Sequence, residues 1–138
     1  MSIDPRAAIV ALWLAKAHSD LSNIDIILLS NREKLPLDTV CFHAQQAIEK
    51  ALKALLAFHG RDLSRSHDLV KLLNDVRDLI PELLDYTEAL ETISEYGVGV
   101  RYPDFFYEPS LDEAHRSYAV AVKVVAIIEG CMGKVCEK

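Results

Sequence analysis

Hydrophobic residues recur every three or four positions through long stretches of the chain, which is the spacing of amphipathic α-helices. The first stretch follows Asp4 and Pro5. This pair favours a helix start, because the aspartate can cap an unpaired backbone N–H and the proline fits the first turn. The second stretch is predicted to start at Asp38, as its cap, and to stop at Gly60. The chain therefore opens with two long helices.

Two shorter helical segments are predicted next. Ser66 can cap a short helix, and Pro81 can open another. Gly97 and Gly99 break the helical pattern and predict the end of that second segment. The aromatic, proline-punctuated residues 102–109 then predict the longest loop.

Ser110 and Glu113 have the spacing of a capping box, so they predict the start of a last helix that runs to the C-terminal region. No strand-like alternation competes with these helices. The sequence therefore predicts an all-α fold, an up-and-down bundle of about five helices, formed by one domain over residues 1–138.

The segment 41–56 has the most ordered arrangement of polar and apolar residues. One predicted face carries mainly large residues: Cys41, Gln45, Ile48, Leu52, Leu55 and His59. A second face carries small residues and one aromatic: Ala47, Ala51, Ala54 and Phe58. A third, which we call the polar stripe, consists of His43, Gln46, Lys50 and Lys53.

Three parts of the chain together resemble the HEPN domain family (higher eukaryote and prokaryote nucleotide-binding). They are residues 41–56, the segment 66–73 and the sequence Arg101-Tyr102-Pro103-Asp104. The similarity extends from Trp13 in the first helix to Ile128 in the last. The resemblance implies the same helical bundle and a homodimer with a cleft between protomers, for which the surface from Tyr96 to Tyr107 is the expected contact. It also implies a partner, a separately encoded minimal nucleotidyltransferase.

Composition narrows the possible functions. The net charge of -6 and pI near 5.3 argue against a broad basic surface for nucleic acid, so any RNA contact is expected to be local. We expect a cytoplasmic protein with no membrane segment, because no apolar run is long enough to span a bilayer and the N-terminal residues do not follow the order of a signal peptide. Three cysteines without a CxxC pair indicate neither a disulfide framework nor a metal site, and we expect no cofactor.

Arg101 is the best single candidate for a functional residue. A guanidinium can hold a phosphate through two parallel hydrogen bonds, and the aromatic residues that follow, such as Tyr102, could stack a base. Alternatively, the aromatics close the end of the bundle or a dimer interface, while Arg101 pairs with Asp104 or Glu108.

Many HEPN proteins that cleave RNA carry an arginine followed, four to six residues later, by a histidine, and the resemblance implies that Arg101 is that arginine. No histidine follows it among residues 102–108, which argues against ribonuclease activity. The spacing does occur between Arg61 and His67, in a different part of the chain. His67 is therefore the second candidate catalytic residue beside Arg101, against the alternative that it is simply held at a helix start.

The polar stripe could bind an anion, since it offers an imidazole, an amide and ammonium groups to one surface. The predicted nucleotide-binding residues are His43, Gln46, Lys50, Arg101, Tyr102 and Asp104. The alternative is a solvated helix face. Asp20 lies near the buried side of the first helix and needs a partner such as Lys16, His43 or Arg101.

Three functions compete at this point. The first is an interaction module that works with a minimal nucleotidyltransferase, as in a toxin–antitoxin system. The second is a metal-independent endoribonuclease at a homodimer cleft, and the third is a nucleotide-binding sensor without catalysis. The missing histidine after Arg101 leaves the question of enzymatic activity open.

Overall fold

The fold is entirely helical in the part of the chain that the computed structural model describes, residues 4–101 and 108–136. This confirms the predicted all-α class. The helices, in chain order, are α1 (Pro5–Leu28), α2 (Leu37–Phe58), α3 (Leu69–Asp75), the 3-10 helix η1 (Pro81–Tyr86), α4 (Thr87–Arg101) and α5 (Leu111–Cys136).

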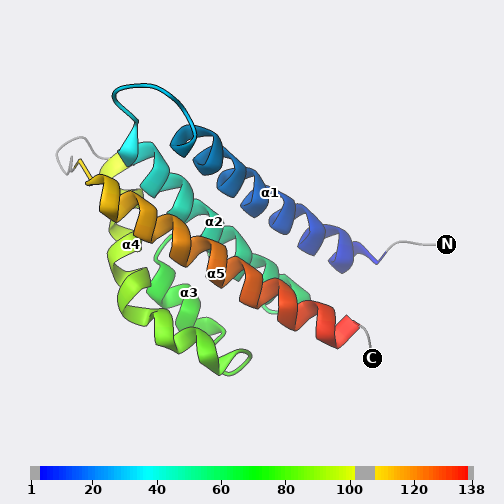
Figure 1. Ribbon diagram of the computed structural model, residues 1–138. Helices are drawn as coiled ribbons and strands as arrows, with labels where there is room; N and C mark the ends of the chain where they lie inside the picture. The colour runs from blue at the N-terminus through cyan, green and yellow to red at the C-terminus, as the bar shows by residue number, and fades with distance from the viewer. Residues whose placement is uncertain (1–3, 102–107, 137–138) are drawn as a thin grey trace.

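Helix α2 lies at the centre of the bundle (Figure 1), where it contacts α1, α3, α4 and α5. Helix α1 packs mainly on α2 and touches α5 only lightly, so it forms one edge of the bundle. Helices α3 and α4 cover the opposite side of α2, and the two ends of the described chain lie at the same end of the molecule. No helix within these residues is long and apolar enough to cross a membrane.

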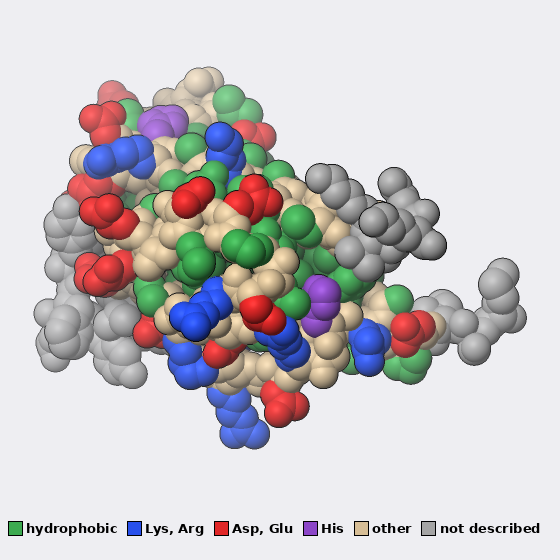
Figure 2. Space-filling model, turned by 90° about the horizontal axis from the view of Figure 1, so that it is seen from below, with side chains coloured by type: hydrophobic (Ala, Val, Ile, Leu, Met, Phe, Trp, Pro, Cys, Tyr) green, Lys and Arg blue, Asp and Glu red, His purple; other side chains and the backbone are tan. Residues whose placement is uncertain are grey.

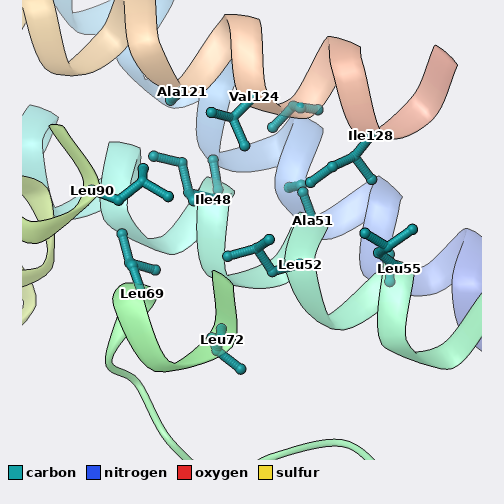
Figure 3. Close-up of a cluster of buried hydrophobic side chains, with 14 of the residues drawn as sticks. Ile48, Ala51, Leu52, Leu55, Leu69, Leu72, Leu90, Ala121, Val124 and Ile128 are labelled. Carbon is teal, nitrogen blue, oxygen red and sulfur yellow. The ribbon is translucent and has the colours of Figure 1, made fainter. Parts of the chain in front are cut away.

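The core is built around α2 because two of its predicted faces are buried at once. Ile48 and Leu52 are fully buried, and the small residues Ala47, Ala51 and Ala54 let neighbouring helices approach closely. Figure 3 shows α2 side chains lying between those of α3, which include Leu69 and Leu72, and those of α5, which include Val124 and Ile128. The larger face is buried from Cys41 to Leu55, and His59 is exposed where it terminates the helix.

Three predicted helix ends are confirmed by hydrogen bonds. The Asp4 side chain accepts from the Arg6 backbone N–H, and Ser110 and Glu113 each cap the backbone N–H of the other. Gly60 follows α2 with a φ of 68°, a conformation that glycine adopts without a steric cost. Its N–H bonds to Ala57 and that of the next residue to Leu56, which closes the helix with a Schellman motif.

Two predicted caps were each wrong by two residues, since the N-cap of α2 is Pro36 and that of α3 is Asp68. Helix α2 starts at Leu37, so Asp38 lies inside the first turn, where its carboxylate accepts from the Thr39 N–H and is favoured by the helix dipole. Helix α3 is capped by Asp68 and not by Ser66. The Ser66 hydroxyl instead accepts from the Asp68 N–H and shapes the turn that precedes the helix.

The prediction that Gly97 and Gly99 break the fourth helix was also wrong, because α4 continues through both to Arg101. Close packing explains the first of these glycines. A β-carbon at Gly97 would lie 3.1 Å from the side-chain amide of Gln45, which would have to shift by a few tenths of an ångström, so the glycine favours the close approach of α4 to α2 here. The glycine marks a contact between helices and not a helix end.

Gly97→Ala should therefore destabilise the protein although alanine favours helices. Gln45 is fully buried and its amide is hydrogen-bonded, so it cannot move aside freely, and we expect a net loss of about 1 to 2 kcal/mol in the free energy of unfolding. Gly130→Ala in α5 is the matched control, since a β-carbon there meets nothing within 4 Å. It should gain up to about 1 kcal/mol. Urea unfolding of both variants measures the difference, and equal stabilisation by both would show that Gly97 has no packing role.

Candidate functional site

Charged residues are buried along one side of α2, which is unusual in a bundle of this size. Asp20, Glu49 and Lys53 are each less than 10% exposed. A buried charge has to be paired and hydrogen-bonded, because it loses its hydration on folding. The structure satisfies these groups in two clusters, which hold most of the candidate site residues.

The Asp20 cluster consists of Asp20 from α1 with His43 and Lys50 from α2. One Asp20 oxygen lies 2.8 Å from Nδ1 of His43, and the other lies 2.7 Å from the ammonium nitrogen of Lys50. The two partners are seven residues apart on α2, so they lie two turns apart on one face and can hold both oxygens of one carboxylate. The prediction that Asp20 needs a partner such as His43 is confirmed, and Lys50 is a second one.

The Glu49 cluster consists of Gln45, Glu49 and Lys53 from α2 with His67 from the segment before α3. Glu49 accepts from Gln45 at 3.1 Å and from Lys53 at 3.2 Å, and it lies 3.0 Å from Nδ1 of His67. Gln45 also donates to the His67 carbonyl oxygen. The Lys53 ammonium further lies 5.7 Å from the centre of the Trp13 ring, within range of a cation–π contact.

These contacts change the interpretation of the polar stripe. Lys50 and Lys53 are mostly buried and paired with carboxylates, so the alternative of a solvated helix face was wrong. Gln46 donates a hydrogen bond to the side-chain oxygen of Gln45 and thereby joins the outer edge of the Glu49 cluster. Nucleotide binding by His43, Gln46 and Lys50 remains a prediction, and a phosphate there would have to compete with Asp20.

His67 is half exposed and lines an open groove of about 530 Å³ between the start of α3 and α4. The groove is acidic, with three carboxylates among its lining residues, which are His67, Asp68, Val70, Glu91, Ser94, Glu95 and Gly97. The Ser94 hydroxyl accepts from the Leu69 N–H and ties α4 to the start of α3. Because Glu49 holds one imidazole nitrogen of His67, the other edge of the ring is available to the groove.

Arg101 is the last residue of α4, one helical turn beyond Gly97 in the groove wall. Helical register therefore puts the Arg101 backbone at the end of the groove that contains His67. The other two predicted residues of this region, Tyr102 and Asp104, lie outside the described residues.

Arg61 is engaged elsewhere, which bears on its spacing match with His67. Its guanidinium forms two hydrogen bonds with the Asp78 carboxylate, at 2.9 and 2.6 Å, and a third with the Asp75 carbonyl oxygen. The hydrogen bond from Arg61 lowers the pKa of Asp78 to about 2. Arg61 therefore stabilises the turn after α3. Its spacing to His67 is explained by this structural role and does not indicate a catalytic pair.

Glu49 is the central residue that the sequence interpretation missed. No role was predicted for it from the sequence, yet three side chains converge on it. The signal was present in the sequence, since Gln45 and Lys53 flank Glu49 at four residues on either side and helical geometry turns such residues toward one another.

Two further buried groups have structural explanations. The Cys41 thiol is fully buried beside the Ser117 hydroxyl, and burial raises its pKa to about 11, so it is an inert core residue. The Tyr96 hydroxyl donates to Glu113, and burial raises the pKa of this tyrosine too. Among the described residues, no group of histidine, cysteine and carboxylate side chains is placed to hold a metal ion.

Comparison with known proteins agrees with this architecture. The model of the HEPN domain family matches residues 10–131, nearly the whole chain, and the protein therefore belongs to the HEPN domain family. A similar solved structure is the crystal structure of TT1696 from Thermus thermophilus. It has a TM-score of 0.72 and 29% identity, over 88% of this chain and 97% of that one. No match was found among curated proteins.

The Asp20 cluster should contribute measurably to stability. Because Asp20 and Lys50 are both largely buried, a double-mutant cycle with Asp20→Asn and Lys50→Met should give a coupling free energy of about 1 to 3 kcal/mol. The exposed pair of Lys71 and Asp75 is the control, for which we expect about 0.3 to 0.5 kcal/mol. Urea unfolding provides both values, and equal coupling in the two pairs would mean that solvent screens Asp20 as well.

Proposed function

We propose that this HEPN-domain protein is a cytoplasmic, homodimeric interaction module in nucleotide or RNA biology. It works with a separately encoded minimal nucleotidyltransferase, in a system of the toxin–antitoxin kind. The supporting observation is that the cations of the polar stripe are committed to internal carboxylates, Lys50 to Asp20 and Lys53 to Glu49. The charged residues of α2 then stabilise the bundle, and a partner would be recognised by other residues on the surface of the bundle.

The charge distribution also supports a protein partner. The groove beside His67 is lined by Asp68, Glu91 and Glu95, which repel a phosphate chain and attract basic side chains. On the face seen in Figure 2, Lys and Arg side chains are interspersed with Asp and Glu and form no continuous basic patch. A nucleic-acid surface would instead need clustered cations.

A binding experiment with the neighbouring gene product tests this proposal. The protein is mixed, at about 10 µM, with a small nucleotidyltransferase encoded beside its gene, and complexes are measured by size-exclusion chromatography with light scattering. We expect a stable complex. Arg101→Ala should weaken it at least about tenfold, or about 1.4 kcal/mol, whereas Arg77→Ala, at an exposed position in another turn, should leave it unchanged. The absence of any complex would contradict the proposal.

A metal-independent ribonuclease is the second candidate, and one observation favours it. The carboxylate of Glu49 orients the His67 imidazole toward the groove, as a general base is oriented in many active sites. Arg101 ends the helix that forms the groove wall, so it is a candidate for stabilising charge on a phosphate at the same site. These two residues would replace the usual pair, in which the histidine follows the arginine by four to six residues.

RNA cleavage in the presence of a chelator distinguishes the two candidates. If the ribonuclease hypothesis holds, Arg101→Ala and His67→Asn should each reduce cleavage of single-stranded RNA or tRNA by a factor of about 100 or more. His115→Ala, an exposed histidine on α5, should cleave as the unmodified protein does. If the unmodified protein cleaves nothing, or all four proteins cleave equally, the ribonuclease hypothesis fails.

A further inference from the structure

Helices α4 and α5 leave an open groove of about 440 Å³ between them. The two helices follow each other in the chain but touch only lightly (Figure 1). The walls of the groove are mainly apolar, and their apolar members are Ala89, Ile93, Ala119 and Val120. Because water gains little from such walls, the groove favours an apolar molecule that displaces the water.

The acidic residue of the groove, Glu113, is engaged within the protein. Its carboxylate accepts from the Tyr96 hydroxyl at 3.0 Å and from the Ser110 N–H at the start of α5. Burial and the bond to Glu113 raise the pKa of Tyr96, so its hydroxyl remains protonated and remains a donor at neutral pH. Glu113 therefore has a structural role at the closed end of the groove.

The basic residue of the groove, Arg116, is much less engaged. It lies one turn beyond Glu113 on α5 and is exposed. Within the described chain its side chain forms no ion pair, and its hydrogen bonding is limited to one long contact, 3.4 Å, from Nε to the Asp112 carbonyl oxygen. The two terminal nitrogens of the guanidinium are therefore available to a ligand.

Apolar walls and one available cation are the complement of an apolar molecule that carries a single acidic group. A guanidinium binds a carboxylate through two parallel hydrogen bonds. Since Arg116 is exposed, the carboxylate of such a ligand would stay near solvent and lose little of its hydration. The apolar body would contact Ile93 and Val120, and this contact would supply most of the affinity.

We propose that the groove between α4 and α5 is a binding site for a small apolar carboxylate whose acidic group pairs with Arg116. The volume of the groove lies within the range of small-molecule pockets, about 300 to 1,000 Å³. This inference does not depend on the proposed function. It uses none of the residues that the sequence predicts to bind nucleotide or to catalyse a reaction.

A helix of a partner protein is a poorer occupant of this groove. With its side chains an α-helix is about 10 Å across and rises about 5.4 Å per turn, so one turn occupies about 420 Å³. The groove thus holds a single turn, which is too little for a specific protein interface. A nucleotide also fits less well, because Asp112 and Glu113 lie beside Arg116 and would repel a group with several negative charges.

Calorimetric titration with octanoate and with octanol tests the site, since the two probes have the same chain length and differ in the acidic group. We expect one octanoate per protein molecule with a Kd on the order of 100 µM, and octanol should bind at least about tenfold more weakly. Arg116→Gln should weaken octanoate binding about tenfold or more, because it removes the charge. Arg77→Gln, at an exposed position outside the groove, should leave it unchanged.

Three results of this titration overturn the proposal. They are the absence of octanoate binding up to about 5 mM, equal affinity for the two probes, and equal binding by Arg116→Gln and Arg77→Gln. Octanoate binding that weakens as the protein concentration is raised would show that a second copy occupies the groove, and this result also overturns the proposal.

Methyl NMR spectra locate the bound octanoate. The methyl signals of Ile93 and Val120 should shift during the titration, whereas those of Leu12, an exposed leucine on α1, should not. Thr92 lines the groove and is exposed, so Thr92→Phe should fill the groove and abolish the shifts while the protein remains folded. Equal shifts at Leu12, or unchanged binding by Thr92→Phe, would show that the chain binds elsewhere and would overturn the proposal.

Discussion

The rest of this structure depends on neutralising two carboxylates inside a helical bundle. Asp20 and Glu49 would destabilise the core if either were left unpaired, since a buried charge without partners costs several kcal/mol. Asp20 connects α1 to α2, and Glu49 connects α2 to the segment before α3. Hydrophobic contacts bring these helices together, but they are not directional and do not fix one register between the helices. The ion pairs select the one register in which both carboxylates are satisfied.

That requirement determines what the central helix can do. A lysine bound to a buried carboxylate is a poor anion receptor, because the ligand would have to release the carboxylate into the core. The helix that most resembles a nucleotide site in sequence is therefore chiefly a structural element, and an open groove lies at its margin. His67 belongs to both regions, since its imidazole touches Glu49 and also lines the groove.

Most of the fold could be predicted from sequence because the hydrophobic spacing that indicates a helix is visible within a short stretch of the chain. Periodicity located the helices, and Asp4, Gly60 and the pair of Ser110 and Glu113 marked three of their ends correctly. Gly97 was misinterpreted because a glycine that ends a helix and a glycine that admits a neighbouring helix look alike in one sequence. Only the position of Gln45 across the interface distinguishes them.

The candidate site was harder to predict, since it depends on contacts between segments far apart in the chain. Helical spacing put His43 and Lys50 on one face, but it could not show that Asp20, on another helix, lies between them. Helical spacing could also have placed Gln45 and Lys53 beside Glu49, but its imidazole partner comes from a segment eighteen residues away. Sequence periodicity assigns a residue to a face, whereas the partner that gives it a role is set by packing.

The contact between Gly97 and Gln45 also has a mechanical consequence. The backbone of α4 rests on the same amide group that holds the His67 carbonyl oxygen and the Glu49 carboxylate. A force applied to the chain beyond Arg101, for example by a bound protein, would be transmitted along α4 to Gln45 and from there to His67. Gln45 would thus couple the end of α4 to the segment that carries His67.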